Sequence, residues 1–290
     1  MVAKRKRVLM TGGAGYVASQ LLPAFREKYE MVLIDIRDED RQGQRVEGVA
    51  VADLTDPDRG KYASHFDGID AVVHLGNRRR SGDPIDHYFD EKVNVEMAYN
   101  VFRSAYDAGV SRVAFASSNH AADWYEYNLI TQGKMDMLES DKLPLSDNFY
   151  GWAKATYEHI GFLFACGAFG RQMGVVMVRI GHPREVNLER FDGNLATYKR
   201  HLGAYISPRD ISQLFTRAIE APNIENEHGV PWQVVYGISN NTRAFWSLAN
   251  ARRVLDYQPE DDSEVKFAEE IYGSLVGKGA TGGIGRVGLT

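Results

Sequence analysis

Short apolar stretches alternate with longer stretches of helical periodicity along most of the chain. Seven of the apolar stretches have the length of a strand and lie at residues 7–11, 31–35, 48–52, 71–75, 112–118, 175–180 and 232–237. Their apolar positions are consecutive rather than alternating, which is typical of strands that helices cover on both faces. Strands and helices that alternate in this way predict an α/β fold, a Rossmann-type doubly wound parallel sheet.

Three long helices are predicted between these strands. One follows the first strand, from about Ala14 to Tyr29, and another covers about residues 149–167. The third runs from Pro84 to Gly109, and a single apolar stripe along it predicts that it packs on the sheet: Phe89, Val93, Met97, Val101 and Ala105.

The pattern loosens after residue 180, where loops separate short helices. We therefore predict a sheet domain over residues 1–180 and a small C-terminal subdomain over residues 181–276, from which residues 232–237 return to the sheet. The Gly-rich stretch 277–290 predicts a flexible tail.

Composition narrows the classes of partner. The chain of 290 residues has a net charge of −5, which gives no general attraction to nucleic acid or to anionic lipid. Its apolar runs are much shorter than the ~20 residues that span a bilayer, and the basic opening "MVAKRKRVLM" lacks the apolar core of a secretory signal. Cys166 is the only cysteine, so no intrachain disulfide forms and a reducing cytoplasm is the expected location.

Two stretches have the glycine spacing of a dinucleotide-binding turn, residues 11–18 ("TGGAGYVA") and 281–288 ("TGGIGRVG"). The first follows a predicted strand and opens a predicted helix, so that backbone N–H groups face a diphosphate there. The second has no strand before it. We therefore predict that Gly12 and Gly15 form the dinucleotide site and that residues 281–288 do not.

Two acids follow this turn at the ends of the next two strands. Asp35 lies about twenty residues beyond the turn, where a carboxylate accepts hydrogen bonds from the adenosine ribose hydroxyls. A 2′-phosphate would meet like charge at Asp35, which favours NAD over NADP, although Arg37 lies close by. Asp53 is placed to approach the adenine amino group, or to be a surface aspartate that caps the next helix instead.

Catalytic side chains are predicted at the carboxyl edge of the sheet. In "YGWAK", Tyr150 and Lys154 are four residues apart and share one helix face. A tyrosine has a pKa of ~10, and a neighbouring ammonium favours its phenolate. Ser118 ends the fifth strand, where its hydroxyl can hold a reacting oxygen while the tyrosine moves the proton.

With these motifs in this order, the chain resembles the extended short-chain dehydrogenases/reductases, the NAD-dependent epimerase/dehydratase family, over nearly its whole length. The resemblance implies that Ser118, Tyr150 and Lys154 form the catalytic triad and that Lys154 also holds the nicotinamide ribose. Asn94 would support the proton relay, or be an ordinary buried asparagine. The other positions implied to contact NAD are Tyr16, Val17, Ile36, Leu54, Leu75, Gly76, Ser117 and Ile180.

Within the family, the stretches "FASSNH", "VRIG" and "VVYGISNN" most resemble uronate dehydrogenases, which oxidise the anomeric carbon of a pyranose acid to a lactone with NAD. This resemblance implies that Arg200 binds the substrate carboxylate. It also places further residues around the sugar: Ser118, Asn119, His120, Tyr150, Gly181 and His182. It implies a homodimer through the helices at about 84–108 and 149–167.

Arg78, Arg79 and Arg80 depart from the small, neutral loop of uronate dehydrogenases. Arg79 falls where those enzymes have a serine that touches the sugar, so we predict that it binds an anionic group of the substrate. Several guanidinium groups suit a phosphate dianion, so a sugar phosphate competes with a uronate. Alternatively, the three form a solvated loop that pairs with Asp83 and Asp86.

We therefore predict an NAD-dependent oxidoreductase that converts C1 of an anionic sugar to a lactone. Two alternatives stay open: a nucleotide-sugar 4-epimerase or dehydratase, and an NAD-binding regulator without turnover. The sequence "VRIGHP" lacks the N-x-x-G-P turn of nucleotide-sugar enzymes, and this departure weakens the epimerase alternative. No metal is expected, because His74 and His182 have no second ligand at metal spacing.

Overall fold

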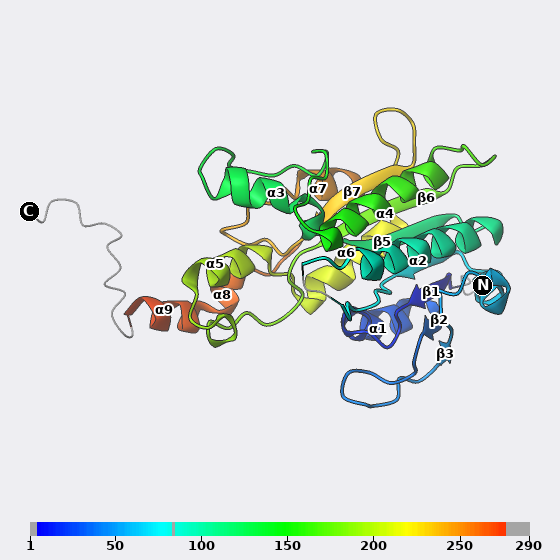
Figure 1. Cartoon of the computed structure of the whole chain (residues 1–290), viewed down its shortest axis with the longest axis horizontal. Coiled ribbons are helices and arrows are strands. Elements are labelled where there is room, and N and C mark those ends of the chain that lie inside the picture. The colour runs from blue at the N-terminus through cyan, green and yellow to red at the C-terminus, as the bar shows by residue number, and fades with distance from the viewer. Residues whose placement is uncertain (1–4, 83–84, 277–290) are drawn as a thin grey trace, which may run out of the picture.

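A computed structural model describes residues 5–82 and 85–276 of the chain. All seven predicted strands form one parallel sheet in the order β3-β2-β1-β4-β5-β6-β7 (Figure 1). The strands are β1 Arg7–Thr11, β2 Glu30–Asp35, β3 Val49–Val51, β4 Ala71–His74, β5 Arg112–Ser118, β6 Gly174–Ile180 and β7 Trp232–Gly237. The predicted Rossmann-type fold is thereby confirmed.

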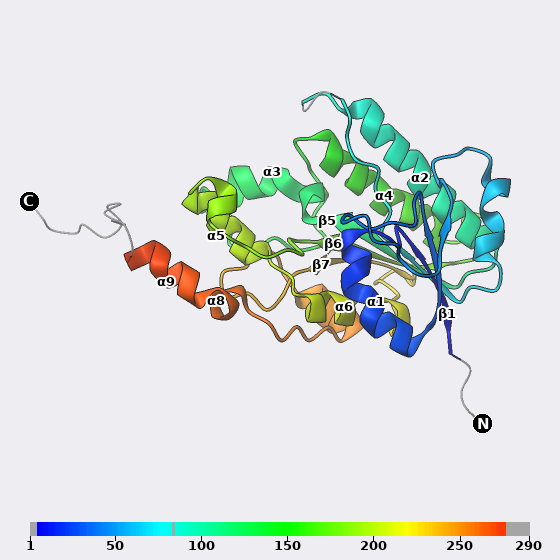
Figure 2. The ribbon, with the colours of Figure 1, turned by 90° about the horizontal axis from the view of Figure 1, so that it is seen from below.

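Helices cover the sheet on both faces, as the continuous apolar strands require. One face carries α1 (Tyr16–Lys28), α6 (Pro208–Glu220) and α7 (Ala249–Leu255), and the other carries α2 (Tyr88–Asp107) and α4 (Phe149–Ala165), as Figure 2 shows. Successive residues of a strand contribute to opposite layers: Val8 and Met10 pack toward α1, whereas Leu9 packs in the layer of α2 and α4. The molecule is therefore a sheet between two apolar layers.

The remaining helices are short. Between β3 and β4 lie η1 (Arg59–Lys61) and η2 (Ala63–Phe66), and after β5 lie η3 (Asn119–Ala122), α3 (Asp123–Tyr125) and the π-helical turn η4 (Glu126–Ile130). Beyond one end of the sheet lie α5 (Leu195–Ala204), α8 (Ser263–Lys266) and α9 (Ala268–Val276), with η5 (Glu189–Phe191) before α5 (Figures 1 and 2). Residues 181–276 thus contribute α6, β7 and α7 to the layered sheet and the other helices to a separate lobe.

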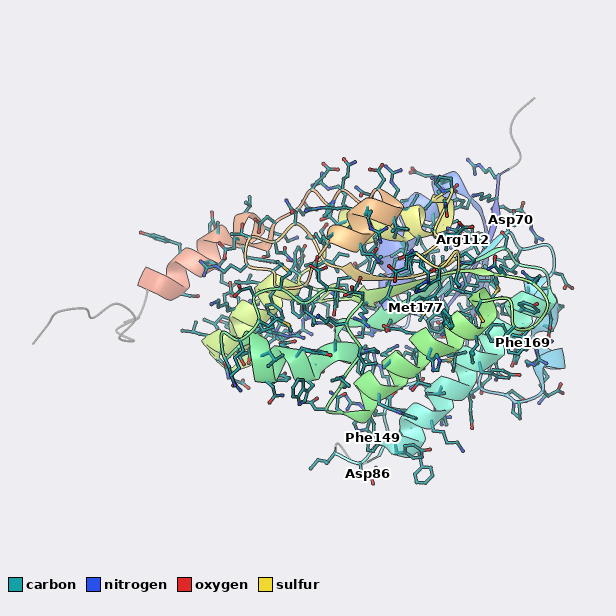
Figure 3. All side chains as sticks on the ribbon, turned by 90° about the horizontal axis from the view of Figure 1, so that it is seen from above. Asp70, Asp86, Arg112, Phe149, Phe169 and Met177 are labelled. Carbon is teal, nitrogen blue, oxygen red and sulfur yellow. The ribbon has the colours of Figure 1, made fainter. Side chains whose placement is uncertain are left out.

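Helix α2, which was predicted from Pro84 to Gly109, differs from its prediction at its start. It begins at Tyr88, and Phe89 is 79% exposed, so the prediction that Phe89 packs on the sheet was wrong. The physical reason is position, because the start of α2 lies at the periphery near Asp86 (Figure 3). Pro84, the stretch 281–288 and the tail 277–290 lie outside the described residues.

Arg112 begins β5 and Asp70 directly precedes β4, so both mark the amino ends of these inner strands. Figure 3 shows both away from Phe149, at the start of α4. Across residues 5–82 and 85–276, no helix is both long and apolar enough to cross a membrane.

Candidate active site

A cleft of about 1310 Å³ opens at the carboxyl ends of the strands. It runs from the β1–α1 turn across the ends of β2 to β6 and reaches the first turn of α4. Most of the predicted site residues line it: Gly12, Gly15, Tyr16, Val17, Asp35, Ile36, Asp53, Leu54, Leu75, Gly76, Arg79, Ser117, Ser118, His120, Tyr150, Lys154, Ile180 and Gly181. The fold thus brings together residues that are far apart in the sequence.

The turn before α1 has the shape that a dinucleotide requires. Gly12 has φ +70°, and a Cβ atom there would lie 2.8 Å from the backbone nitrogen of Gly76. Only glycine lets the two backbones approach so closely. Gly15 caps α1 without a side-chain hydrogen bond, and the first turn of α1 holds no acid. The positive end of the helix therefore faces the cleft, which fits an NAD diphosphate.

Two carboxylates lie farther along the cleft from this turn. Asp35 accepts hydrogen bonds from the backbone nitrogens of Ala14 (3.0 Å) and Ile36 (2.7 Å), which fix it at the end of β2. Asp53 accepts from both the backbone nitrogen (2.9 Å) and the hydroxyl (2.7 Å) of Thr55. Asp53 therefore closes its own turn and lines the cleft. The next helix, η1, is capped by Asp58, so the alternative in which Asp53 caps that helix was wrong.

The three predicted catalytic side chains meet at the other end of the cleft. Ser118 lies at the end of β5 and Tyr150 in the first turn of α4, and the Ser118 hydroxyl is near enough to lower the pKa of Tyr150. One turn later, the Lys154 ammonium lies 5.3 Å from the centre of the Tyr150 ring. This ammonium donates hydrogen bonds to Asn77 Oδ1 (3.1 Å) and to the carbonyl of Ala116 (3.4 Å), which hold it toward the cleft.

Gly151 allows this approach, although the sequence analysis did not single it out. A Cβ atom at Gly151 would overlap the carbonyl oxygen of His120 and the hydroxyl of Ser146. The first turn of α4 can therefore lie against η3 only with glycine here. The glycine directly after the tyrosine in "YGWAK" was the available signal.

The charges around Lys154 and Tyr150 oppose one another. Burial lowers the pKa of Lys154 to about 8, and Glu91 acts against this shift. Burial raises the pKa of Tyr150, while the hydrogen bond with Ser118 and the charge of Arg80 lower it. The expected depression of the tyrosine pKa is thus not seen in the protein alone, because desolvation of the phenolate outweighs its favourable neighbours.

Glu91 is a buried acid of this site that sequence reasoning missed. It is 1% exposed, lines the cleft and accepts a hydrogen bond from Asn94 Nδ2 (3.1 Å). Burial raises its pKa, and Asn94, Lys154, His87 and Arg80 lower it. No motif marks a single glutamate on a helix, so only the packing of α2 against α4 reveals its place.

The three consecutive arginines diverge. The pKa of Asp90 is lowered mainly by the hydrogen bonds that it accepts from Ser81 and Gly82, and less by the charge of Arg78. Arg79 is one of the charges that lower the pKa of Arg41. Arg80 lies with a guanidinium nitrogen 3.3 Å from His87 Nε2 and acts on the pKa of Tyr150. Of the three, Arg80 is therefore the one that faces the catalytic end. Asp83, a partner in the solvated-loop alternative, lies outside the described residues.

Four predicted site residues do not line the cleft: Asn94, Asn119, His182 and Arg200. Asn94 holds the loop after β4, since its amide bonds both the backbone nitrogen (2.7 Å) and the carbonyl (3.0 Å) of Arg78. Arg200 forms a two-bond ion pair with the buried Glu126, at 2.6 and 3.0 Å. Burial alone would lower the pKa of Arg200, and Glu126 raises it. The guanidinium expected to bind a substrate carboxylate thus already holds one from the protein.

A second buried ion pair supports the strand that ends in Ser118. Arg179 on β6 and Glu158 on α4 form two hydrogen bonds of 2.8 and 2.7 Å, with side chains 1% and 4% exposed. Ser117 donates to Glu158 Oε1 at 2.8 Å, and Arg179 donates to the Tyr236 hydroxyl at 3.0 Å. Every charge of this network is thus compensated beneath the floor of the cleft.

His74 is fully buried beneath the cleft. It bonds Thr11 Oγ1 through Nδ1 at 2.5 Å and packs on Phe115. Burial first, and then the charge of Lys154, lowers its pKa to about 3. Within the described part of the chain, no group of three or more His, Cys, Asp or Glu residues gathers as a metal site.

This histidine makes stability depend on pH. Above its ordinary pKa of ~6.5 the imidazole is neutral in both states; below it, only the unfolded chain binds the proton until the folded pKa of about 3. We expect the free energy of unfolding to fall below pH 6.5 by up to about 1.4 kcal/mol per pH unit from His74. In His74→Gln, the free energy of unfolding measured with urea between pH 7 and 4 should fall less steeply with decreasing pH than in the wild type. The exposed His228→Gln is the matched control, and an unchanged slope in His74→Gln would contradict the assignment.

A family model, related sequences and a solved structure all indicate the same family of enzymes. A model of the NAD dependent epimerase/dehydratase family matches residues 8–182. NAD-dependent glucose-6-phosphate dehydrogenase of Haloferax volcanii is 33% identical over 268 residues, which cover 88% of this chain and 94% of the relative. Uronate dehydrogenase of Pseudomonas syringae pv. tomato is 29% identical over 267 residues, covering 89% and 83%. A mutant uronate dehydrogenase from Agrobacterium tumefaciens, solved in complex with NAD, superposes with a TM-score of 0.70 at 26% identity, covering 93% of this chain and 90% of that one.

Proposed function

Because the chain belongs to the NAD dependent epimerase/dehydratase family, we propose that it is an NAD-dependent dehydrogenase that oxidises C1 of an anionic sugar to the lactone. The observation that carries this proposal is the meeting of Ser118, Tyr150 and Lys154 in the cleft that also holds the Gly12 turn and Asp35. The relatives named above are sugar dehydrogenases, which supports the same chemistry.

In this proposal, residues 1–180 bind NAD and the lobe within residues 181–276 contributes to the sugar site. The Gly12–Val17 turn holds the diphosphate and Asp35 the adenosine ribose. Toward the nicotinamide end, the wall is formed by Leu75, Gly76, Ser117 and Ile180. Support comes from the close backbone approach at Gly12 and from the fixed orientation of the Asp35 carboxylate. That carboxylate disfavours a 2′-phosphate, which supports NAD rather than NADP.

The side chains at the catalytic end have separate roles in the proposed oxidation. Tyr150 accepts the proton of the C1 hydroxyl, and Ser118 donates a hydrogen bond to the same oxygen. Lys154 places a positive charge beside the phenolate, and Glu91 helps to keep that ammonium charged against its burial. When bound, NAD supplies the acceptor for the hydride that leaves C1.

The anionic group of the sugar is proposed to bind at Arg80. This residue is exposed, acts on the pKa of Tyr150 and has no carboxylate within 4 Å among the described residues, whereas Glu126 neutralises Arg200. His120 and Gly181 line the cleft near the triad, which supports a sugar site there. Their neighbours Asn119 and His182 do not line it, so we give them no direct contact with the sugar.

A substrate panel tests the proposed function. We expect NADH to form, as measured by absorbance, with a uronate or a sugar phosphate, at a kcat/KM at least about tenfold above that of the neutral sugar. Arg80→Gln should raise KM for the anionic sugar about tenfold and leave KM for the neutral sugar unchanged, with Arg78→Gln as the matched control. Any change in kcat from the lost charge near Tyr150 should be the same for both sugars. Equal use of neutral and anionic sugars would contradict the anion site, and a lack of NADH with every sugar would contradict the dehydrogenase.

A homodimer in the cytoplasm completes the proposal. The outer faces of α2 and α4 expose several large apolar side chains: Tyr88, Phe89, Tyr99, Trp152 and Leu163. Such a patch on two neighbouring helices is typical of an interface, which supports a dimer through them. The single cysteine supports a reducing compartment.

A further inference from the structure

Four arginines from three separate loops gather over the dinucleotide end of the cleft. Arg37 and Arg41 come from the loop after β2, Arg79 from the loop after β4 and Arg184 from the loop after β6, and all four line the cleft. Tyr16, the first residue of α1, lies among them. The guanidinium carbons of Arg184 and Arg41 lie 4.7 and 5.4 Å from the centre of its ring.

These guanidinium groups lack the partners that other arginines of the protein have. Among the described residues, none of the four forms an ion pair with a carboxylate, whereas Arg45 in the same loop pairs with Asp38 and Arg200 pairs with Glu126. Burial lowers the pKa of Arg41, and the charges of Arg184, Arg79 and Arg37 lower it further. Like charges held together without a counter-ion cost free energy, and a bound anion would recover it.

The position of the cluster indicates which anion. Tyr16 directly follows the Gly12–Gly15 turn, so the cluster lies over the same helix end that presents backbone N–H groups to the cleft. Guanidinium groups bind phosphate oxygens in pairs of hydrogen bonds, and they bind a doubly charged group better than a single charge. Asp35 and the catalytic triad lie to either side of this point, at the ribose and sugar ends of the proposed site.

We propose that Arg41 and Arg184, with Arg79, bind the diphosphate of the dinucleotide on the side opposite the backbone of the Gly12–Gly15 turn. This inference rests on the placement of the dinucleotide proposed above and adds a second half to its binding site, made of side chains. The backbone turn and the arginines would then enclose the diphosphate between them, and the affinity for the dinucleotide would depend on both.

Hydrogen bonds within the protein hold the loop that carries Arg41. Residues Glu39 and Arg45 form an antiparallel bridge, and Asp40 Oδ1 accepts hydrogen bonds from the backbone nitrogens of Gln42 (2.8 Å) and Gln44 (2.9 Å). Arg41 therefore stands on a small closed loop. Because the backbone of this loop is already held in place, ordering it costs less entropy when Arg41 binds an anion.

Binding of nucleotide fragments to the purified full chain tests the clamp without relying on catalysis. Isothermal titration calorimetry would compare adenosine, adenosine 2′-phosphate and ADP, which differ only in the number and position of their phosphates. We expect Arg41→Ala and Arg184→Ala each to weaken ADP binding about tenfold and to leave adenosine within about twofold. Arg45→Ala is the matched control in the same loop, with no expected change, and near-ultraviolet circular dichroism verifies that each variant is folded.

Each other outcome overturns the inference in a distinguishable way. If the wild type prefers ADP to adenosine but both arginine variants keep that preference, the backbone turn alone binds the diphosphate. If adenosine 2′-phosphate binds better than ADP and Arg41→Ala removes the difference, the cluster serves a 2′-phosphate. If the folded wild type binds neither adenosine nor ADP, the dinucleotide site of the proposed function is itself wrong, and the clamp with it.

Discussion

Replacement of Tyr150 by phenylalanine is expected to lower kcat by roughly 10²- to 10⁴-fold with the best sugar of the panel, because it removes the group that accepts the C1 proton. The ring remains, so the packing of α4 against η3 and the edge contact with His120 are preserved. We therefore expect NADH binding, followed by its fluorescence, to change little. A loss in kcat without a loss in cofactor affinity is the signature of a residue that acts on the reacting oxygen.

Tyr157 provides the matched control on the same helix. Its ring lies 4.8 Å from the Lys154 ammonium, closer than the ring of Tyr150, but its hydroxyl is buried without a hydrogen-bond partner among the described residues. Tyr157→Phe should keep kcat within a few-fold of the wild type, since it deletes only that unpaired hydroxyl. Full activity in Tyr150→Phe, or an equal loss in both variants, would rule out Tyr150 as the proton acceptor.

The second large effect concerns stability. Glu158→Gln is expected to lower the free energy of unfolding by about 3–5 kcal/mol, because it leaves the Arg179 guanidinium buried without a negative charge. Urea unfolding followed by circular dichroism gives this quantity. The exposed pair of Lys92 and Glu96 is the control, and Glu96→Gln should change the free energy by no more than about 0.5 kcal/mol.

Removing both charges separates the ion pair from the space it fills. The double variant Glu158→Leu and Arg179→Met should recover most of the lost stability, since similar apolar volume replaces both ions. This variant remains informative even if Glu158→Gln fails to fold. A double variant as unstable as the single one would show that packing or the bonds to Ser117 and Tyr236, rather than an uncompensated charge, cause the loss.

The fold was predictable because its strands carry a redundant signal. A strand covered on both faces must be apolar at successive positions, so β5 and β6 were predictable to within a residue from the sequence alone. The helix ends were less certain. The apolar stripe of α2 continues to Phe89, but the sequence does not show how far the sheet extends beneath this helix. Phe89 lies beyond the part of α2 that packs on the sheet.

The residues of the candidate site were also predictable only in part. Gly12, Asp35, Ser118 and Tyr150 belong to spaced motifs whose chemistry depends on local backbone geometry, and the structure places them in one cleft. Side chains that act through distant pairing gave no such signal. Glu126 is separated from Arg200 by 74 positions, and only the folded lobe shows that one neutralises the other. Among the three consecutive arginines the sequence singled out Arg79, yet the path of the loop sends each to a different neighbour, and Arg80 is the one whose charge acts on Tyr150.

The order of the strands has a consequence for synthesis of the chain. Residues 181–231 separate β6 from its last neighbour β7, so at ~5–20 residues per second a ribosome needs on the order of 3–10 s to make the intervening stretch. During that interval the apolar strand "GVVMVRI" has an open hydrogen-bonding edge, to which another nascent chain could add. Protection by chaperones would matter most in this window, and fragments that stop short of residue 232 should aggregate.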